Sequence, residues 1–558
     1  MASREEVLAG LTGPGGDFEL AQAEVRGVPM RVYKNAPASL RDMFLGTAAF
    51  GDQDFLIYED RTLTFSEHFR QVAALAAHLK EKGIKKGDRV AIGMRNYPEW
   101  VVSFWACQVI GAVTVALNAW WTGGELDYAL EDSGTSLLIV DEERFERLKD
   151  VPSASGLIEV IVARAEGDIG AATCFEEIVA KGGALPDAEI SPDEHATILY
   201  TSGTTGRPKG AVATHRNHIT NIMNTMLNGA VNAGLAGEAA PPPPENPGAL
   251  QTFPFFHVGG MTGLYMATLT GLRLALMHRW SAAKALDLIE QHRLTAAGGV
   301  PYVVRQLLEE AEAQGRSLSS LMAMTSGGAS VPPDLIRTIG DRFARKVAPA
   351  NGYGLTETTG AVIVNSGDAY LDTPDSVGRP VVTADVRVVD GTRDCKDGEI
   401  GEIWIGGPNI IPGYWNRPEA TEEAFGGGWF KTGDLGYRDE SGCYRVVDRK
   451  KDVIIRGGEN IYCAEIEAAL LEHPSVRDVA IIGLPDKALG EIVGCVIQQA
   501  DEEKSEKELE GELTEYLLAR LARFKIPARY AMTDEEMPRT ATGKLLKRDI
   551  RKQFFGVG

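Results

Sequence analysis

Apolar and polar residues alternate with two different periods in the first third of the chain. Over residues 65–82 the apolar side chains fall on one helical stripe, whereas residues 113–117 form a short apolar run that is typical of a buried strand. The middle third repeats this alternation, with strand-like residues 196–200 and helix-like residues 282–292. Strands that alternate with helices form βαβ units, whose parallel strands are buried on both faces. We therefore expect an α/β fold with a large N-terminal domain built from such sheets.

The pattern changes twice toward the C-terminus. Over residues 378–448, short alternating segments separated by turns indicate a small antiparallel β unit. After residue 452, strand and helix patterns follow one another in a compact α+β order, and the last long helix is expected over residues 506–523. We place the main boundary near residues 449–452. It divides the chain into a large domain of residues 1–450 and a small, mobile C-terminal domain of residues 451–558.

Composition narrows the class of protein. Of the 558 residues, 44% are apolar, which is enough for large buried cores and excludes a disordered or fibrous chain. Lys and Arg number 57 against 78 Asp and Glu, a net charge of −21 that argues against a nucleic-acid partner. Six scattered cysteines without a CxxC pair favour reduced thiols and a cytoplasmic protein over a disulfide scaffold or a zinc module. The sequence is compatible with a homodimer without specifying one.

Two segments need a separate interpretation. Residues 100–124 carry no charged side chain and are long enough to span a bilayer. Polar residues such as Gln108 and Asn118 interrupt this run, and we expect a buried helix–turn–strand and no transmembrane segment. The Pro-rich residues 239–248 favour an extended surface loop whose role the sequence does not define.

The strongest local signal is the motif YTSGTTGRPKG at residues 200–210. A predicted strand runs into a loop in which glycines let backbone amides turn toward an anion, while hydroxyls and one lysine add donors. This is the chemistry of a polyphosphate cradle. It is not the common P-loop motif, because Pro208 stands where that motif requires glycine. The candidate phosphate contacts are Thr201, Ser202, Gly203, Thr204, Thr205, Gly206 and Lys209.

The motif TSGTTGRPKG resembles the phosphate-binding signature of the adenylate-forming superfamily, which contains acyl-CoA synthetases, adenylation domains of peptide synthetases, and luciferases. The resemblance extends over residues 55–547, through several motifs in the order of that family. It implies ATP, Mg²⁺ and coenzyme A as cofactor and co-substrates.

The motif NGYGLTETTG at residues 351–360 is similar to the segment in which this family places an adenine-packing aromatic and a magnesium-binding acid. The resemblance implies that Tyr353 packs on adenine and that Glu357, with Thr204, helps to hold Mg²⁺, which prefers carboxylate and phosphate oxygens. Small residues leave room for backbone to approach the nucleotide. The remaining nucleotide contacts implied are Gly327, Gly328, Ala329, Asn351, Gly352, Gly354 and Thr356.

Two further motifs resemble the ribose site and the interdomain hinge. In WFKTGDLGY, Asp434 matches the aspartate that accepts hydrogen bonds from both ribose hydroxyls, and Arg449 is implied to contact ribose as well. The same resemblance places Lys451 at the hinge between the two domains. Gly457 and Gly458 would then line the pantetheine channel when the small domain moves.

The motif PRTATGK near the C-terminus places Lys544 at the position of the family's catalytic lysine. A carboxylate that attacks the α-phosphate brings two anions together, and a mobile ammonium stabilises that transition state. In FPFFHVGGM, His257 matches a position between the nucleotide and acyl sites, although a lone histidine also suits a purely structural role. The candidate catalytic residues are therefore Lys544, Glu357 and His257, and the candidate acyl-pocket residues are His257, Val258, Gly259 and Met261.

Together these motifs imply a two-step ligase that joins a carboxylic acid to coenzyme A through an acyl adenylate. A medium- or long-chain fatty acid is the favoured substrate, and a phenylpropenoic acid is the next. An adenylating enzyme that loads a carrier protein, and an ATP-binding sensor without catalysis, are the alternatives.

Overall fold

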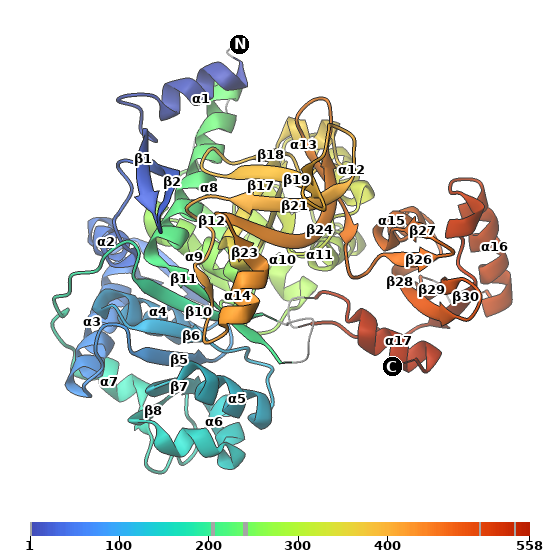
Figure 1. The fold of residues 1–558 in the computed structure, drawn as a ribbon. Helices are drawn as coiled ribbons and strands as arrows, with labels where there is room; N and C mark the ends of the chain where they lie inside the picture. Colours follow the sequence, from blue (N-terminus) through green and yellow to red (C-terminus); the bar gives the residue numbers. More distant parts are fainter. Residues whose placement is uncertain (1–2, 202–206, 238–243, 501–503, 541–542, 558) are drawn as a thin grey trace.

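The computed structural model describes residues 3–201, 207–237, 244–500, 504–540 and 543–557 (Figure 1). Two large sheets and their helices form the main body, and the C-terminal α+β part lies beside it, coloured red in Figure 1. This mixed α/β arrangement of a large and a small part confirms the fold class that the sequence predicts.

The first sheet brings the phosphate-loop motif to one edge. Its described strands run in the order β22 (Gly413–Tyr414), β11 (Lys209–Thr214), β10 (His195–Thr201), β6 (Val113–Ala116), β5 (Arg89–Gly93), β7 (Leu137–Asp141), β8 (Glu159–Ala163) and β9 (Thr173–Cys174). The centre and the β9 edge are parallel, as the βαβ pattern predicts, whereas β10, β11 and β22 pair antiparallel. The hairpin of β10 and β11 therefore holds the two ends of the motif together.

The second sheet carries the nucleotide motif. Its order is β18 (Arg379–Pro380), β17 (Gly360–Ser366), β16 (Ala348–Leu355), β15 (Ala323–Gly327), β14 (Ala296–Gly299), β12 (Gly248–Gln251), β13 (Arg273–Leu276), β3 (Asp54–Tyr58) and β4 (Arg61–Thr64). The strands from β16 to β3 are parallel, and their carboxyl ends face one edge. Ligands bind at this edge in open α/β sheets.

Helices cover the sheets and supply the core. They are α1 (Arg4–Thr12), α2 (Leu40–Gly46), α3 (Phe65–Glu81), α4 (Pro98–Ile110), α5 (Gly123–Ser133), α6 (Glu142–Glu146), α7 (Phe175–Lys181), α8 (His215–Ala236), α9 (Val258–Thr270), α10 (Ala282–Gln291), α11 (Pro301–Ala313), α12 (Pro333–Arg342) and α13 (Asp368–Asp372). In α3, a reciprocal cap between Thr64 and Glu67 satisfies the first free backbone amides, and apolar residues of one stripe are buried.

The uncharged segment after residue 100 is a buried helix–turn–strand, as predicted. Helix α4 is buried from Trp100 to Ile110, and its chain reverses at Gly111, which has the positive φ of 73° that favours glycine. Strand β6 follows in the centre of the first sheet. No helix within the described residues is both long and apolar enough to cross a membrane.

A third sheet, which is antiparallel, follows the large ones. It contains β20 (Arg393–Asp394), β19 (Asp385–Asp390), β21 (Gly401–Gly406), β24 (Trp429–Arg438), β23 (Phe425–Gly426) and β25 (Tyr444–Arg449), with α14 (Pro418–Ala424) beside it. Its last strand ends in a turn in which the Asp452 amide donates to the Arg449 carbonyl at 2.9 Å. The predicted hinge residue Lys451 lies exposed in this turn.

The C-terminal part has its own sheet and core. Its elements are β26 (Ile454–Arg456), β27 (Glu459–Ile461), α15 (Cys463–Leu471), β28 (Val476–Asp486), β29 (Gly490–Gln499), α16 (Glu506–Leu518), β30 (Arg529–Thr533) and α17 (Lys547–Phe555). The prediction that one helix covers residues 506–523 was wrong at its end, because α16 stops at Leu518. Pro527 lies a few residues beyond and favours an extended Ile526, which is observed at φ −68° and ψ 132°.

Candidate active site

The carboxyl ends of β15 and β16 form the floor of the candidate site. Gly327 ends β15 and lies opposite Gly352 in the parallel register, so the two predicted nucleotide segments are adjacent. Strand β16 then turns back into β17, and these strands approach closely at Gly354. A Cβ atom on Gly354 would lie only 1.9 Å from the Gly360 carbonyl oxygen, so this approach requires glycine.

Tyr353, Asp434 and Arg449 meet above this floor, although they come from separate motifs. The Tyr353 hydroxyl donates to Asp434 Oδ2 at 2.7 Å, and Arg449 Nε lies 2.9 Å from Asp434 Oδ1. Asp434 and Arg449 are register partners on β24 and β25, and only 4% of Asp434 is exposed. Burial, followed by the charge of Asp434, raises the pKa of Tyr353 well above 10, so its hydroxyl remains a donor. The carboxylate is thus held in place before any ligand arrives.

Lys544, from the C-terminal part, lies within electrostatic range of the same group. Desolvation by the surrounding protein, and then the positive charge of Arg449, lowers the pKa of Lys544 to about 8, while Asp434 and Asp452 act in the opposite direction. Part of the side chain remains exposed to solvent. The ammonium is therefore in electrostatic reach of the carboxylate that sequence analysis assigned to ribose.

A tight hairpin holds Lys544. Its amide donates to Thr540 Oγ1 at 3.1 Å, and Arg539 donates to the Gly543 carbonyl at 2.6 Å. Arg539 also forms an ion pair with Asp478 on β28, which ties the hairpin to the sheet of the C-terminal part. The catalytic candidate thus lies on a braced loop.

The C-terminal part contacts the large domain beside α11. The Tyr302 hydroxyl donates to Glu536, and the Arg539 guanidinium lies 4.5 Å from the Tyr302 ring centroid. A Cβ atom on Gly543 would lie 2.8 Å from Val300, which precedes α11. These contacts keep Lys544 turned toward the large domain.

Only two of the candidate phosphate-binding residues lie within the described part of the chain. Ser202, Gly203, Thr204, Thr205 and Gly206 lie outside the described residues, whereas Thr201 and Lys209 form the last pair of the β10–β11 hairpin. The Lys209 ammonium lies 5.2 Å from the ring centroid of Tyr414. The same tyrosine donates its hydroxyl to Glu357 Oε1 at 2.7 Å, so it links the phosphate and metal candidates.

Sequence reasoning missed Tyr414. The residue lies on β22, which pairs with β11, and the next residue, Trp415, donates its amide to Gly210 at 2.7 Å. Tyr414 is therefore brought to the end of the phosphate motif by strand pairing across about 200 positions of sequence. The aromatic pair at residues 414–415, which precedes a helix-starting Pro418, was the available signal.

Glu357 fits a magnesium ligand. It is 9% exposed, and its backbone carbonyl accepts from the Ile411 amide at 3.0 Å, which fixes its position. Oε1 accepts from Tyr414, whereas no hydrogen bond to Oε2 occurs among the described residues, so one hard oxygen is free. The described residues contain no cluster of three His, Cys, Asp or Glu side chains that could hold a metal alone. Mg²⁺ would accordingly take most of its ligands from phosphate and water.

The acyl candidates divide into two groups. His257 precedes α9, and burial lowers its pKa to about 4, so the imidazole is neutral at neutral pH. A Cβ atom on Gly259 would lie 3.5 Å from Phe253, and one on Gly328 would lie 3.4 Å from the same ring. Phe253 thus lies between the start of α9 and the nucleotide floor. Val258 is half-buried near this ring, whereas Met261 is fully buried in the main core.

The two glycines predicted to line the pantetheine channel do not lie at the nucleotide floor. Gly457 and Gly458 form the exposed turn between β26 and β27, with φ values of 60° and 92°. Within the described residues, no hydrogen bond or ion pair joins this turn to Asp434. Among the other nucleotide candidates, Ala329 follows Gly328, Asn351 lies on β16, and Thr356 starts the single helical turn that holds Glu357.

Two family models match the chain. One, described as AMP-binding enzyme, matches residues 46–415, and the other, described as AMP-binding enzyme C-terminal domain, matches residues 465–544.

Curated relatives span nearly the same length. The 2-succinylbenzoate–CoA ligase of Bacillus velezensis is 34% identical over 499 residues, which cover 89% of this chain and 94% of the relative. A feruloyl-CoA synthase of Amycolatopsis is 37% identical over 494 residues, with coverages of 88% and 94%. The solved o-succinylbenzoate CoA synthetase of Bacillus subtilis, in complex with its acyl-adenylate intermediate, is 31% identical with a TM-score of 0.77 and coverages of 91% and 97%. That synthetase is also known with ATP and a magnesium ion.

Proposed function

The chain belongs to the AMP-binding enzyme family and is an ATP-dependent acyl-CoA ligase that works through an acyl adenylate, and we propose that its acid is aromatic. The single observation that carries the assignment of roles is the position of Lys544, which lies within electrostatic range of Asp434 and Arg449. The names of the relatives, a feruloyl-CoA synthase and two succinylbenzoate ligases, support an aromatic acid over the fatty acids that the sequence alone favours.

The acyl side of the site supports the same choice. Phe253 lies near both Gly328 and Gly259, so small residues border an aromatic ring. Flat rings stack favourably in offset or edge-to-face geometry. We assign the ring of the substrate to the space beside Phe253 and Val300, and its carboxylate to the Gly328 end.

In the first half-reaction, the substrate carboxylate oxygen attacks the α-phosphorus of ATP, and pyrophosphate leaves. Asp434 accepts hydrogen bonds from the ribose hydroxyls, and the Tyr353 ring packs on adenine. The Lys544 ammonium offsets the charge of the two approaching anions. Glu357 would hold Mg²⁺ through its free oxygen, and the ion would neutralise phosphate charge when bound.

In the second half-reaction, the C-terminal part turns about Lys451 and brings Gly457 and Gly458 to the site. The sulfur of coenzyme A attacks the acyl carbon, AMP leaves with the bonding pair, and the thiol proton goes to solvent. A pKa of about 4 makes His257 a weak base at neutral pH, so we assign it the separation of the nucleotide and acyl sites rather than proton transfer.

The test is a panel of acids assayed for AMP release with ATP, Mg²⁺ and coenzyme A. Ferulate, 4-coumarate, 2-succinylbenzoate and benzoate represent aromatic acids, and octanoate and palmitate represent fatty acids. We expect the best aromatic acid to exceed both fatty acids in kcat/KM by at least about tenfold, the discrimination that a shaped apolar pocket provides. A fatty acid that matches or exceeds every aromatic acid would contradict the proposal.

A further inference from the structure

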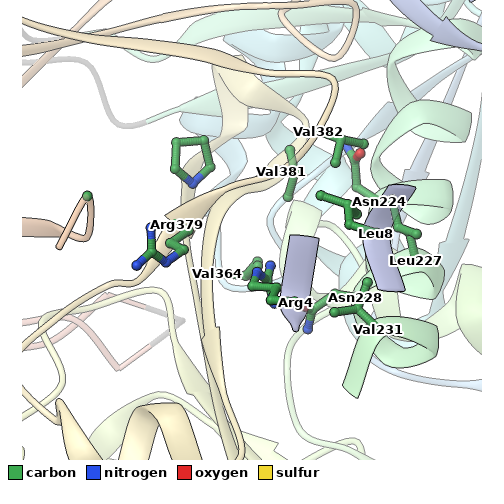
Figure 2. A pocket seen from close by; sticks show the side chains of 12 residues that line it. Arg4, Leu8, Asn224, Leu227, Asn228, Val231, Val364, Arg379, Val381 and Val382 are labelled. Atoms are coloured by element: carbon green, nitrogen blue, oxygen red, sulfur yellow. The ribbon is translucent and has the colours of Figure 1, made fainter. Parts of the chain in front are cut away.

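A half-open cavity of about 250 Å³ lies under the N-terminal helix. Helix α1 packs on α8 and, with β17 and β18, borders a space that Figure 2 shows from close by. None of the candidate catalytic or nucleotide residues lines it. Every residue that lines it is described.

Two guanidinium groups mark one end of this cavity. Arg4 comes from α1 and Arg379 from β18, and the lining contains no carboxylate. Arg4 makes no ion pair or side-chain hydrogen bond to any described residue, and Arg379 donates only to the Ser441 carbonyl, at 2.5 Å. Two arginines without acidic partners in a chain of charge −21 form a local site for an anion.

A buried amide marks the inner end. Asn224 on α8 is 3% exposed, and its Oδ1 accepts from the Tyr33 hydroxyl at 2.7 Å and from Thr383 Oγ1 at 3.0 Å. Its Nδ2 has no hydrogen-bond partner among the described residues. Buried polar groups are almost always satisfied, and this amide nitrogen is an exception that is closed off from the cavity by its neighbours.

The walls between the two ends are apolar. Leu8 of α1, Leu227 and Val231 of α8, and Val381 next to β18 line this stretch, and Figure 2 shows Leu8 and Leu227 on the side that also carries Asn224. A small inorganic anion would leave these side chains uncovered, whereas a long acyl chain exceeds the volume. Ligand sites combine such apolar walls with a few convergent polar groups.

We propose that this cavity is a second, non-catalytic binding site for a small amphipathic carboxylic acid. The carboxylate pairs with Arg4 and Arg379, and an apolar or aromatic body lies along Leu227 and Val231. Val364 lines the cavity and is the register partner of Gly352, so the ligand would lie one strand away from the nucleotide floor.

Calorimetric titration of the full-length protein with 4-methoxybenzoate tests the proposal. The titration is run with and without saturating 5′-O-(N-benzoylsulfamoyl)adenosine, which occupies the active site. With this inhibitor present we expect one saturable site per chain. The double variant Arg4→Gln/Arg379→Gln should weaken that binding at least about tenfold, because it removes both charge-assisted bonds.

Matched controls separate the site from general effects. Arg387→Gln/Arg393→Gln removes the same charge from two arginines of β19 and β20 outside the cavity and should leave binding unchanged. The neutral 4-methoxybenzamide should not bind. The variant Leu8→Trp fills the cavity without changing charge and should abolish binding, with thermal unfolding checked separately.

Absence of saturable binding to the inhibitor-loaded wild type overturns the proposal, as does undiminished binding to the Arg4→Gln/Arg379→Gln variant. Loss of the inhibitor-sensitive site alone would instead count against the proposed substrate and leave this cavity site standing.

Discussion

At the scale of single residues, the charge of Lys544 links structure to rate. Burial lowers its pKa from 10.5 to about 8, so the side chain is an ammonium below that pH and is neutral above it. Adenylate formation needs the ammonium, so kcat/KM for pyrophosphate release should fall as pH rises through about 8, because this parameter reports the free enzyme. Lys544→Arg should move the alkaline limb beyond pH 10, since guanidinium does not deprotonate there. If the alkaline limb of the kcat/KM profile stays at the same pH in the variant, a group other than Lys544 causes that limb.

The two half-reactions should depend on Lys544 unequally. Lys544→Ala should slow adenylate formation by about 10²–10³, the usual loss on removal of one transition-state charge partner. Thioester formation from preformed acyl adenylate should remain within about threefold of wild type, because the lysine then has no charge to balance. Lys450→Ala is the matched control, because Lys450 is a nearby lysine that is 66% exposed and pairs with Glu402. Equal loss in both half-reactions would remove Lys544 from its assigned role.

Tyr414 should act as a positioning residue for Glu357. Tyr414→Phe keeps the ring beside Lys209 and removes only the hydroxyl that donates to Glu357 Oε1. Partners that orient a metal ligand typically affect metal affinity by about 10–100-fold. We expect the Mg²⁺ concentration for half-maximal pyrophosphate exchange to rise at least about tenfold, at the low end of such effects, with a smaller change in kcat at saturating Mg²⁺. Phe430→Leu, a buried change on β24, controls for general loosening. An unchanged Mg²⁺ requirement would show that the hydroxyl does not position the carboxylate.

At the scale of elements, local pattern predicted the helices and missed some pairings. Helix α3 and strand β6 lie within a residue or two of their predicted bounds, because hydrophobic period and capping are local properties. The resemblance to the adenylate-forming superfamily is confirmed by the family matches. The hairpin of β16 and β17 escaped prediction because glycines rather than alternating apolar residues fill β16. Its tight contact at Gly354 is a tertiary property.

The residues of the candidate site also differ in whether a local motif could identify them. Tyr353, Asp434 and Arg449 could be named from their motifs, although only the structure brings Asp434 between the other two. Tyr414 could not be named, because its role arises from the pairing of β22 with β11, which no local pattern encodes. The assigned functions of the remaining candidates stay predictions.

The lysine hairpin gives an element-scale prediction. Gly543 has φ of 81°, and a Cβ there would meet Val300 at 2.8 Å. Gly543→Ala should therefore strain the hairpin and slow adenylate formation by about tenfold, since a non-glycine residue in this region costs roughly 1–2 kcal/mol. Gly511→Ala is the matched control, because Gly511 lies within α16 with open space around it and alanine favours a helix. Wild-type rates in Gly543→Ala would show that the hairpin is not held against Val300 during catalysis.

At the scale of the whole molecule, one orientation cannot serve both half-reactions. The contacts of Tyr302 with Glu536 and Arg539 place Lys544 at the nucleotide side, and in the same orientation the Gly457–Gly458 turn has no described contact with Asp434. Arg337 and Glu472 add an ion pair at 3.5 Å between the two parts, but both side chains are about half exposed, so it contributes little. The Cys463 amide also donates to Asp448 across the turn at residues 449–452, which is where the chain passes from one part to the other.

Locking that turn should separate the half-reactions. Lys451→Pro fixes φ near −65° at the third residue of the turn and restricts the preceding Lys450, so it stiffens the turn while no described backbone bond of the Lys451 amide is lost. We expect adenylate formation to stay within about threefold of wild type, and thioester formation from preformed adenylate to fall by about 100-fold, because closure and reopening complete the second site. Lys451→Ala, which removes the side chain and keeps the backbone free, should leave both rates nearly unchanged. Rapid-quench measurement of the two steps tests this prediction. If Lys451→Pro transfers the acyl group to coenzyme A at the wild-type rate, the chain does not turn at this residue. The proposed role of Gly457 and Gly458 in the thiol step would then have no support.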